Sequence, residues 1–219
     1  MKKLLLITIV CIIVATASSC SSKESSSPAT GIPEWAVALM RTVPDNTPFV
    51  ALLDIETLRA DADLQAYFTD RKDWFYKSSF FSENMFDFSK LDFWVSCTYG
   101  DIISGNFDIE TAQGMLVNNN WSHVNYGNFT VFEQENCLGQ KENIAFGQEY
   151  VISGLNSLGN TIIETINGGL ESIYENEDFQ ELMAQLPADS FEISYADNDF
   201  TTSDGDSINL QAGNSISKI

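Results

Sequence analysis

Basic residues and histidine are scarce in this chain. Its 219 residues include 11 Lys and Arg against 31 Asp and Glu, with one His, for a formal net charge of -20 at pH 7. A surface this acidic repels nucleic acid, because binding to phosphate depends on Lys and Arg. Nucleic acid is therefore not expected as a partner.

The scarcity of His and Cys also restricts the chemistry. His123 is the only histidine and lies in a polar stretch after Trp121, where a surface or packing role is the expected one. A nucleophilic triad needs a base beside its nucleophile, and a zinc site needs several His or Cys ligands. Glycine-rich nucleotide-binding motifs are missing as well. We predict no catalytic residue, no metal ligand and no cofactor.

Only four cysteines occur, and two of them precede the folded region. Cys11 and Cys20 belong to the N-terminal segment, which leaves Cys97 and Cys137. Outside the cytoplasm two thiols can form one disulfide if their Cα atoms lie within about 7 Å. The sequence leaves both a Cys97–Cys137 disulfide and two free thiols open.

The first twenty residues have the pattern of a secretory signal peptide. Lys2 and Lys3 precede an apolar run, residues 4–15, that is shorter than the roughly 20 residues of a membrane-spanning helix. Small residues at 17–19 then lead to Cys20, as in the lipobox of bacterial lipoproteins. This indicates lipidation at Cys20; the alternative is an ordinary secretory signal cut near Ala17, with Cys20 an incidental thiol.

The chain divides into four expected parts. A lipoprotein signal covers residues 1–19, and a Ser-rich, flexible tether covers 20–31. One α+β domain is expected over 32–200, followed by a polar tail over 201–219. The expected location is the cell envelope, outside the cytoplasm, with the N-terminal lipid in the membrane.

Periodicity predicts an α+β fold with a mainly antiparallel sheet and helices packed on one face. Hairpins and single helices interleave without the regular rhythm of a parallel fold. A turn is expected at Gly100-Asp101, and one long helix over 155–173, with Ile162 and Ile166 buried. The strands expected to share the sheet are Phe49–Asp54, Leu91–Cys97, Ile102–Phe107, Phe129–Phe132, Tyr150–Ser153 and Phe191–Tyr195.

Several short motifs resemble those of a known family. The chain resembles a family of uncharacterised bacterial secreted proteins and lipoproteins, a domain of unknown function, over roughly Pro44 to Tyr195. The resemblance supports the anchor and the fold and implies no activity and no catalytic residues. The motifs that carry it are Gly105–Asp108, Tyr126–Phe132, Phe146–Gly154 and Glu177–Leu182.

Aromatic residues are dense between Tyr67 and Trp94. Four of them stand among Ser, Asn and Glu in an expected loop and form a candidate exposed binding surface: Phe80, Phe81, Phe86 and Phe88. The acid-rich segments at 197–199 and 204–209 suit a hard ion such as Ca²⁺, although solvated tail acids explain them as well.

The preferred functional hypothesis is a non-enzymatic, lipid-anchored protein that binds a protein or small-molecule partner or serves an envelope role. One alternative is a hydrolase of envelope material that uses paired carboxylates. The other alternative is a Ca²⁺-stabilised surface protein. A hydrolase of this kind requires two acids close together in a cleft, with pKa values that differ.

Replacing Cys20 tests the anchor. The Cys20→Ala variant has no thiol to acylate, so we expect it to move from the membrane fraction to the soluble fraction and to lose labelling by a radioactive or clickable fatty acid. Membrane association that persists in the variant, together with an unlabelled wild type, would contradict the lipoprotein interpretation.

Overall fold

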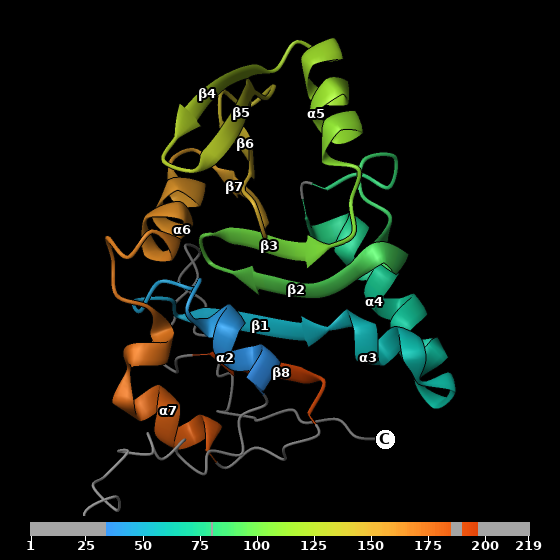
Figure 1. Cartoon of the computed structure of the whole chain (residues 1–219), viewed down its shortest axis with the longest axis vertical. Helices are drawn as coiled ribbons and strands as arrows, with labels where there is room; N and C mark the ends of the chain where they lie inside the picture. Colours follow the sequence, from blue (N-terminus) through green and yellow to red (C-terminus); the bar gives the residue numbers. More distant parts are fainter. Residues whose placement is uncertain (1–33, 80, 185–189, 197–219) are drawn as a thin grey trace, which may run out of the picture. The chain divides into compact units, whose positions relative to one another are not determined.

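One eight-stranded antiparallel sheet organises the described part of the chain. The computed structural model describes residues 34–79, 81–184 and 190–196. Its strand order is β4-β5-β6-β7-β3-β2-β1-β8 (Figure 1). The strands are β1 (Phe49–Asp54), β2 (Leu91–Cys97), β3 (Gly100–Gly105), β4 (Ser122–Tyr126), β5 (Phe129–Glu135), β6 (Lys141–Phe146), β7 (Val151–Leu155) and β8 (Glu192–Ala196).

The prediction of an α+β fold with all six expected strands in one antiparallel sheet is confirmed. Two further strands extend it. β6 lies between β5 and β7, whereas β4 forms one end of the order, and neither is among the six expected strands. β4 has the sequence SHVNY, with Val124 as its one aliphatic residue, so the apolar pattern that reveals other strands is weak there.

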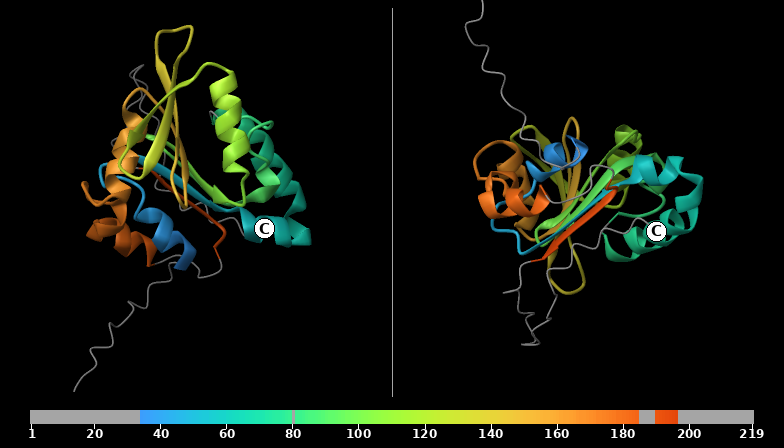
Figure 2. Two further views of the ribbon diagram at one scale, coloured as in Figure 1. Left: turned by 45° about the horizontal axis from the view of Figure 1, so that its top comes forward. Right: turned by 90° about the horizontal axis from the view of Figure 1, so that it is seen from below.

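Helices cover both faces of the sheet, which corrects the expectation of one covered face (Figure 2). The face against α2, α6 and α7 is called face A here, and the opposite face, against α3, α4 and α5, is called face B. The central strands are apolar on both sides because each side meets a helical layer. The helices are α2 (Glu34–Met40), α3 (Ile55–Ala60), α4 (Gln65–Ser78), α5 (Ile109–Asn118), α6 (Leu158–Ile166) and α7 (Glu177–Met183).

β1 shows how one strand serves both cores. Val50 and Leu52 are fully buried in the face A core, and Leu53, the next residue after Leu52, is buried in the face B core. The strand then passes directly into α3, and Asp54 caps this helix: its carboxylate accepts a hydrogen bond of 2.8 Å from the Thr57 amide. The continuous apolar run thus indicates burial on two sides.

The turn between β2 and β3 lies earlier than expected. Gly100 is already the first residue of β3, so the turn is formed by Thr98 and Tyr99. Gly100 has φ +144°, and a Cβ there would stand 1.9 Å from the Ser153 carbonyl oxygen. A glycine is required at this position because β7 approaches the backbone closely.

The helix expected over 155–173 is much shorter. α6 ends at Ile166, and Gly168, with φ +75°, turns the chain away. Ile162 is fully buried as predicted, but Ile166 is only half-buried. Gly159 does bring the helix close to the sheet, because a Cβ there would lie 2.4 Å from Asn143 Oδ1.

Two alanine substitutions on α6 should differ in cost. Ile162→Ala leaves a cavity in the face A core, so we expect it to lower the free energy of unfolding by about 2–5 kcal/mol. Ile166→Ala removes a half-buried side chain and should cost clearly less. Urea titration of both variants measures the difference. Equal losses would contradict the placement of α6.

Candidate functional site

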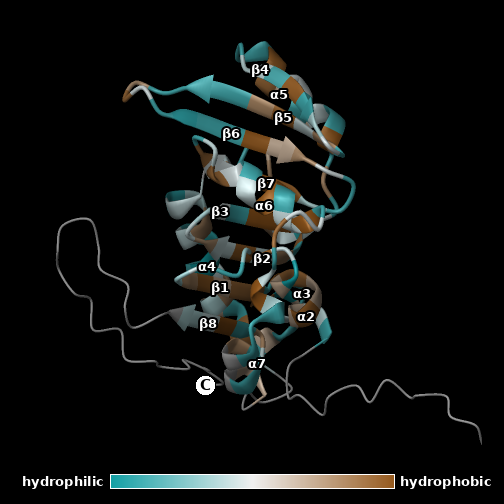
Figure 3. Ribbon diagram, turned by 90° about the vertical axis from the view of Figure 1, so that its left-hand side faces the viewer, coloured by the Kyte–Doolittle hydropathy of each residue, from teal (hydrophilic) through white to brown (hydrophobic). Residues whose placement is uncertain are grey.

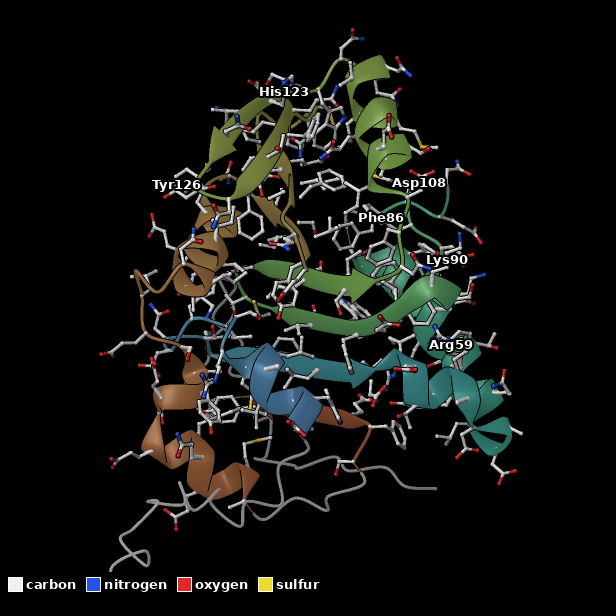
Figure 4. The ribbon with its side chains drawn as sticks, viewed as in Figure 1. Arg59, Phe86, Lys90, Asp108, His123 and Tyr126 are labelled. Carbon is white, nitrogen blue, oxygen red and sulfur yellow. The ribbon has the colours of Figure 1, made fainter. Side chains whose placement is uncertain are left out.

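The predicted aromatic binding surface is wrong. Phe81, Phe86 and Phe88 are 2%, 0% and 0% exposed and belong to the face B core. Figure 4 shows Phe86 inside the molecule, between α5 and the sheet. The polar residues around them face solvent while the rings pack inward, against Phe75 and Phe107 among others. Phe80 lies outside the described residues.

The two thiols are free and lie in different surroundings. Cys97 is buried at the end of β2, and Cys137 is exposed in the turn between β5 and β6. The disulfide that the sequence left open is therefore not formed. Burial raises the pKa of the Cys97 thiol to about 12, which keeps it protonated and unreactive.

Asp101 is a buried carboxyl group near the middle of the sheet. It is 6% exposed and accepts a hydrogen bond of 3.0 Å from Trp94 Nε1. Burial raises its pKa to about 6, although neighbouring donors, Trp94 first, oppose the shift. Ser153 lies opposite on β7, and its buried hydroxyl has no hydrogen-bond partner of regular geometry.

A second shifted acid, Glu192, lies on β8. Arg71 Nη2 of α4 stands 3.2 Å from Glu192 Oε1, and the guanidinium lies over the rings of Tyr67 and Trp74. Burial raises the pKa of Glu192 to about 7. Burial also lowers the pKa of Arg71, and the charge of Asp70 opposes that shift. Arg71 Nε and Glu192 Oε2 have no hydrogen-bond partner.

These two acids do not form a hydrolytic pair. Asp101 is on β3 and Glu192 on β8, with β2 and β1 between them. Three strand spacings separate their backbones by about 14 Å. Two-carboxylate glycosidases hold their acids roughly 5–9.5 Å apart. The geometry does not favour the hydrolase alternative at these residues.

An open pocket lies on face A, beneath α2. Its volume is about 220 Å³, and its lining comes from four parts of the fold. Phe93 of β2 and Ser104 of β3 are directly paired at its base, and Tyr150 directly precedes β7. The lining residues are Trp35, Ala38, Leu39, Phe93, Ser104, Glu149 and Tyr150.

Aromatic rings and one carboxylate determine the character of this pocket. Trp35 and Phe93 stack almost parallel, with ring centroids 5.6 Å apart and an interplanar angle of 8°. Both rings are half-buried, as is Tyr150, whereas Glu149 is exposed at the rim. Burial, followed by the charge of Glu149, raises the pKa of Tyr150, so its hydroxyl remains a neutral donor. No single sequence motif contains these residues together, because they are distant from one another in the chain.

A second, larger cavity of about 380 Å³ lies beyond the end of α6. Arg41 borders it with its guanidinium over the Tyr174 ring at 4.8 Å, and Glu171 and Glu175 border it as well. Glu175 is already engaged by the Ser172 amide at 2.9 Å. Charges of both signs border this cavity, and Glu175 already accepts a hydrogen bond from the Ser172 amide. The lining therefore favours no particular class of ligand.

The remaining predicted residues are placed as follows. Cys20 and the acid-rich segments from 197 onward lie outside the described residues. His123 is exposed on β4, with its ring 5.3 Å from Phe132. Among the described residues, no group of three or more His, Cys, Asp or Glu could hold a metal ion. In the same part of the chain, no helix is long and apolar enough to cross a membrane.

The Asp101 carboxyl predicts a pH dependence of stability. Its folded pKa, about 6, exceeds the unfolded value of about 3.9, so the folded state holds the proton more tightly. The raised pKa of Asp101 stabilises the folded state fully below about pH 4. This contribution to the free energy of unfolding, at most about 3 kcal/mol, is lost as the pH rises through 6. Asp101→Asn keeps the acceptor for Trp94 and cannot ionise. Relative to wild type, this variant should gain stability in urea titrations between pH 4 and 7; a constant difference would contradict the shift.

Comparisons with known proteins identify no relative. No family model, no curated protein and no solved structure matches the chain. The family resemblance of the motifs therefore stays a prediction, and a functional proposal depends on the residues themselves.

Proposed function

We propose that this protein is a lipid-anchored, extracytoplasmic binding protein whose pocket beneath α2 receives an organic ammonium group. The observation that carries the proposal is the lining of that pocket, in which Trp35, Phe93 and Tyr150 surround about 220 Å³ beside the carboxylate of Glu149. The protein acts by binding and performs no reaction.

The lining favours a cation for an electrostatic reason. The face of an aromatic ring carries partial negative charge and attracts ammonium groups, most strongly for Trp. Glu149 adds a full negative charge at the rim, and the whole chain, at -20, draws cations toward its surface. An anion would meet repulsion from each of these sources.

The size of the pocket favours a single functional group. Sites for complete drug-sized ligands or cofactors occupy about 300–1,000 Å³. A cavity of about 220 Å³ is smaller and suits one headgroup or one side chain. Trimethylammonium groups and the ammonium of a lysine side chain share this chemistry and fit the proposal.

The sequence places this pocket close to the expected anchor. Trp35 follows Cys20 by fifteen residues, and a fully extended chain of that length spans about 50 Å. If Cys20 is acylated, the pocket can move only within that distance of the membrane. Its ligands would therefore be groups presented at the membrane surface or in the adjacent envelope.

Choline and its neutral carbon isostere 3,3-dimethylbutan-1-ol test the proposal by isothermal titration calorimetry. We expect choline to bind and the isostere to bind much more weakly, because only choline carries a charge. Trp35→Ala should weaken choline binding about five- to thirtyfold, and Glu149→Gln about two- to fivefold.

Glu110→Gln is the matched control, since it removes one exposed carboxylate from α5, on face B. It should leave choline binding at the wild-type level. Circular dichroism of Trp35→Ala establishes that α2 and the sheet remain folded. Equal binding of the isostere, or equal losses in both Gln variants, would refute recognition of a cation in this pocket.

A further inference from the structure

β4 forms an open edge of the sheet. It is the terminal strand of the order, and its label stands at the upper end of the sheet in Figure 3. Within the described part of the chain it pairs with β5 alone, and four of its five residues are exposed. Figure 4 places His123 and Tyr126 along this strand at the outer side of the fold. At the opposite edge, β8 runs into residues outside the description, so only β4 can be assessed as an edge.

Among the residues that the structure describes, β4 lacks the usual protection of an edge strand. Edge strands are commonly blunted by Lys, Pro, a bulge or a covering helix, because their outer amide and carbonyl groups can pair with another chain. β4 has the sequence SHVNY, without charge or proline, and its pairing with β5 is regular throughout. Val124, at its centre, is 55% exposed.

The side chains of β4 that project on face A are Ser122, Val124 and Tyr126. Their direct partners on β5 are Glu133, Val131 and Phe129, and the last two belong to the face A core. Directly paired residues project on the same face of a sheet. Face A of β4 therefore has an apolar centre at Val124 between two polar ends.

Both ends lie beside carboxylates. At one end Ser122 is opposite Glu133, whose Oε2 is 3.6 Å from Lys141 Nζ in an exposed ion pair. At the other end the Tyr126 hydroxyl donates a hydrogen bond of 2.6 Å to Glu164 Oε1 on α6. A strand added outside β4 would approach two carboxylates at positions four residues apart, Glu133, which also faces Lys141, and Glu164, with Val124 between them.

We propose that β4 is a strand-addition surface for an extended segment of a partner protein with basic residues at positions i and i+4 and an apolar residue at i+2. The backbone of the segment would pair with the open edge. One basic side chain would reach across β4 to Glu133 on β5, two strand spacings or about 10 Å away, and the other would reach toward Glu164 on α6. Its apolar residue would cover Val124.

A second copy of the chain fits this edge less well. Pairing β4 with itself would bring the Glu133 and Glu164 carboxylates of two copies to one seam, on chains that each carry a charge of -20. Like charges placed together at an interface oppose association. A basic partner segment relieves the same charges.

This surface is separate from the pocket beneath α2. Pocket residues Phe93 and Ser104 lie on β2 and β3, and β4 is four strand positions from β3, about 19 Å. The strand-addition proposal therefore does not depend on the ammonium site, and either one can fail without the other.

The probe is a synthetic seven-residue threonine peptide with lysine at its second and sixth positions and valine at its fourth, labelled with a fluorophore. Fluorescence anisotropy should show saturable binding to the wild-type protein. Val124→Lys places a positive charge at the centre of the edge and should weaken binding at least tenfold. Val117→Lys is the matched control, because Val117 is 52% exposed on α5 and the variant has the same net charge. It should bind like the wild type.

A second peptide of identical composition, with its lysines adjacent, separates strand pairing from simple charge attraction. Weak binding of this peptide supports the proposed spacing, whereas equal binding of both peptides overturns it. Failure of the first peptide to bind the wild type also overturns the proposal. Dimerisation of the wild type in analytical ultracentrifugation, abolished by Val124→Lys, would assign the edge to a second copy instead.

Discussion

Burial of the central strands from both sides is the interaction on which this fold depends. β1, β2, β3 and β7 each supply apolar side chains to two separate cores, and each core is closed by its own helices. Neither helical layer could stay in place without the sheet between them, because short helices such as α2 and α3 are unstable alone in water. Removal of either layer would expose half of every central strand.

The two candidate sites follow from where this double coverage ends. α2 covers only part of face A, and the pocket lies beneath it, where Trp35, Phe93 and Tyr150 are half-buried. β4 is the terminal strand and four of its five residues are exposed, so its outer edge is open within the described part of the chain. The core therefore stabilises the sheet, and the incompletely covered parts remain available for binding.

Sequence reasoning predicted what depends on local periodicity and missed what depends on packing. The apolar segment Phe49–Asp54 was correctly expected to join the sheet, and Ile162 was correctly expected to be buried. The prediction for Phe86 and Phe88 was wrong because their polar sequence neighbours suggested exposure, whereas both rings are buried. The density of aromatic residues from Tyr67 to Trp94 was the better indication of a hydrophobic core. The pocket could not be foreseen, since Trp35 and Tyr150 meet only through the fold.

The pairing of β1 with β8 has a consequence for how the chain acquires its structure. Phe49 faces Ala196, so the first and last described strands are neighbours although nearly the whole domain separates them in sequence. Contacts this distant form late, because the loop between them must be closed first. During synthesis, which proceeds from the N-terminus, one edge of β1 stays unpaired until the last strand is complete. This sheet can therefore be completed only after the whole domain has been synthesised. A prematurely terminated chain would leave the outer edge of β1 unpaired, and such an edge is a target for aggregation and for quality-control proteases.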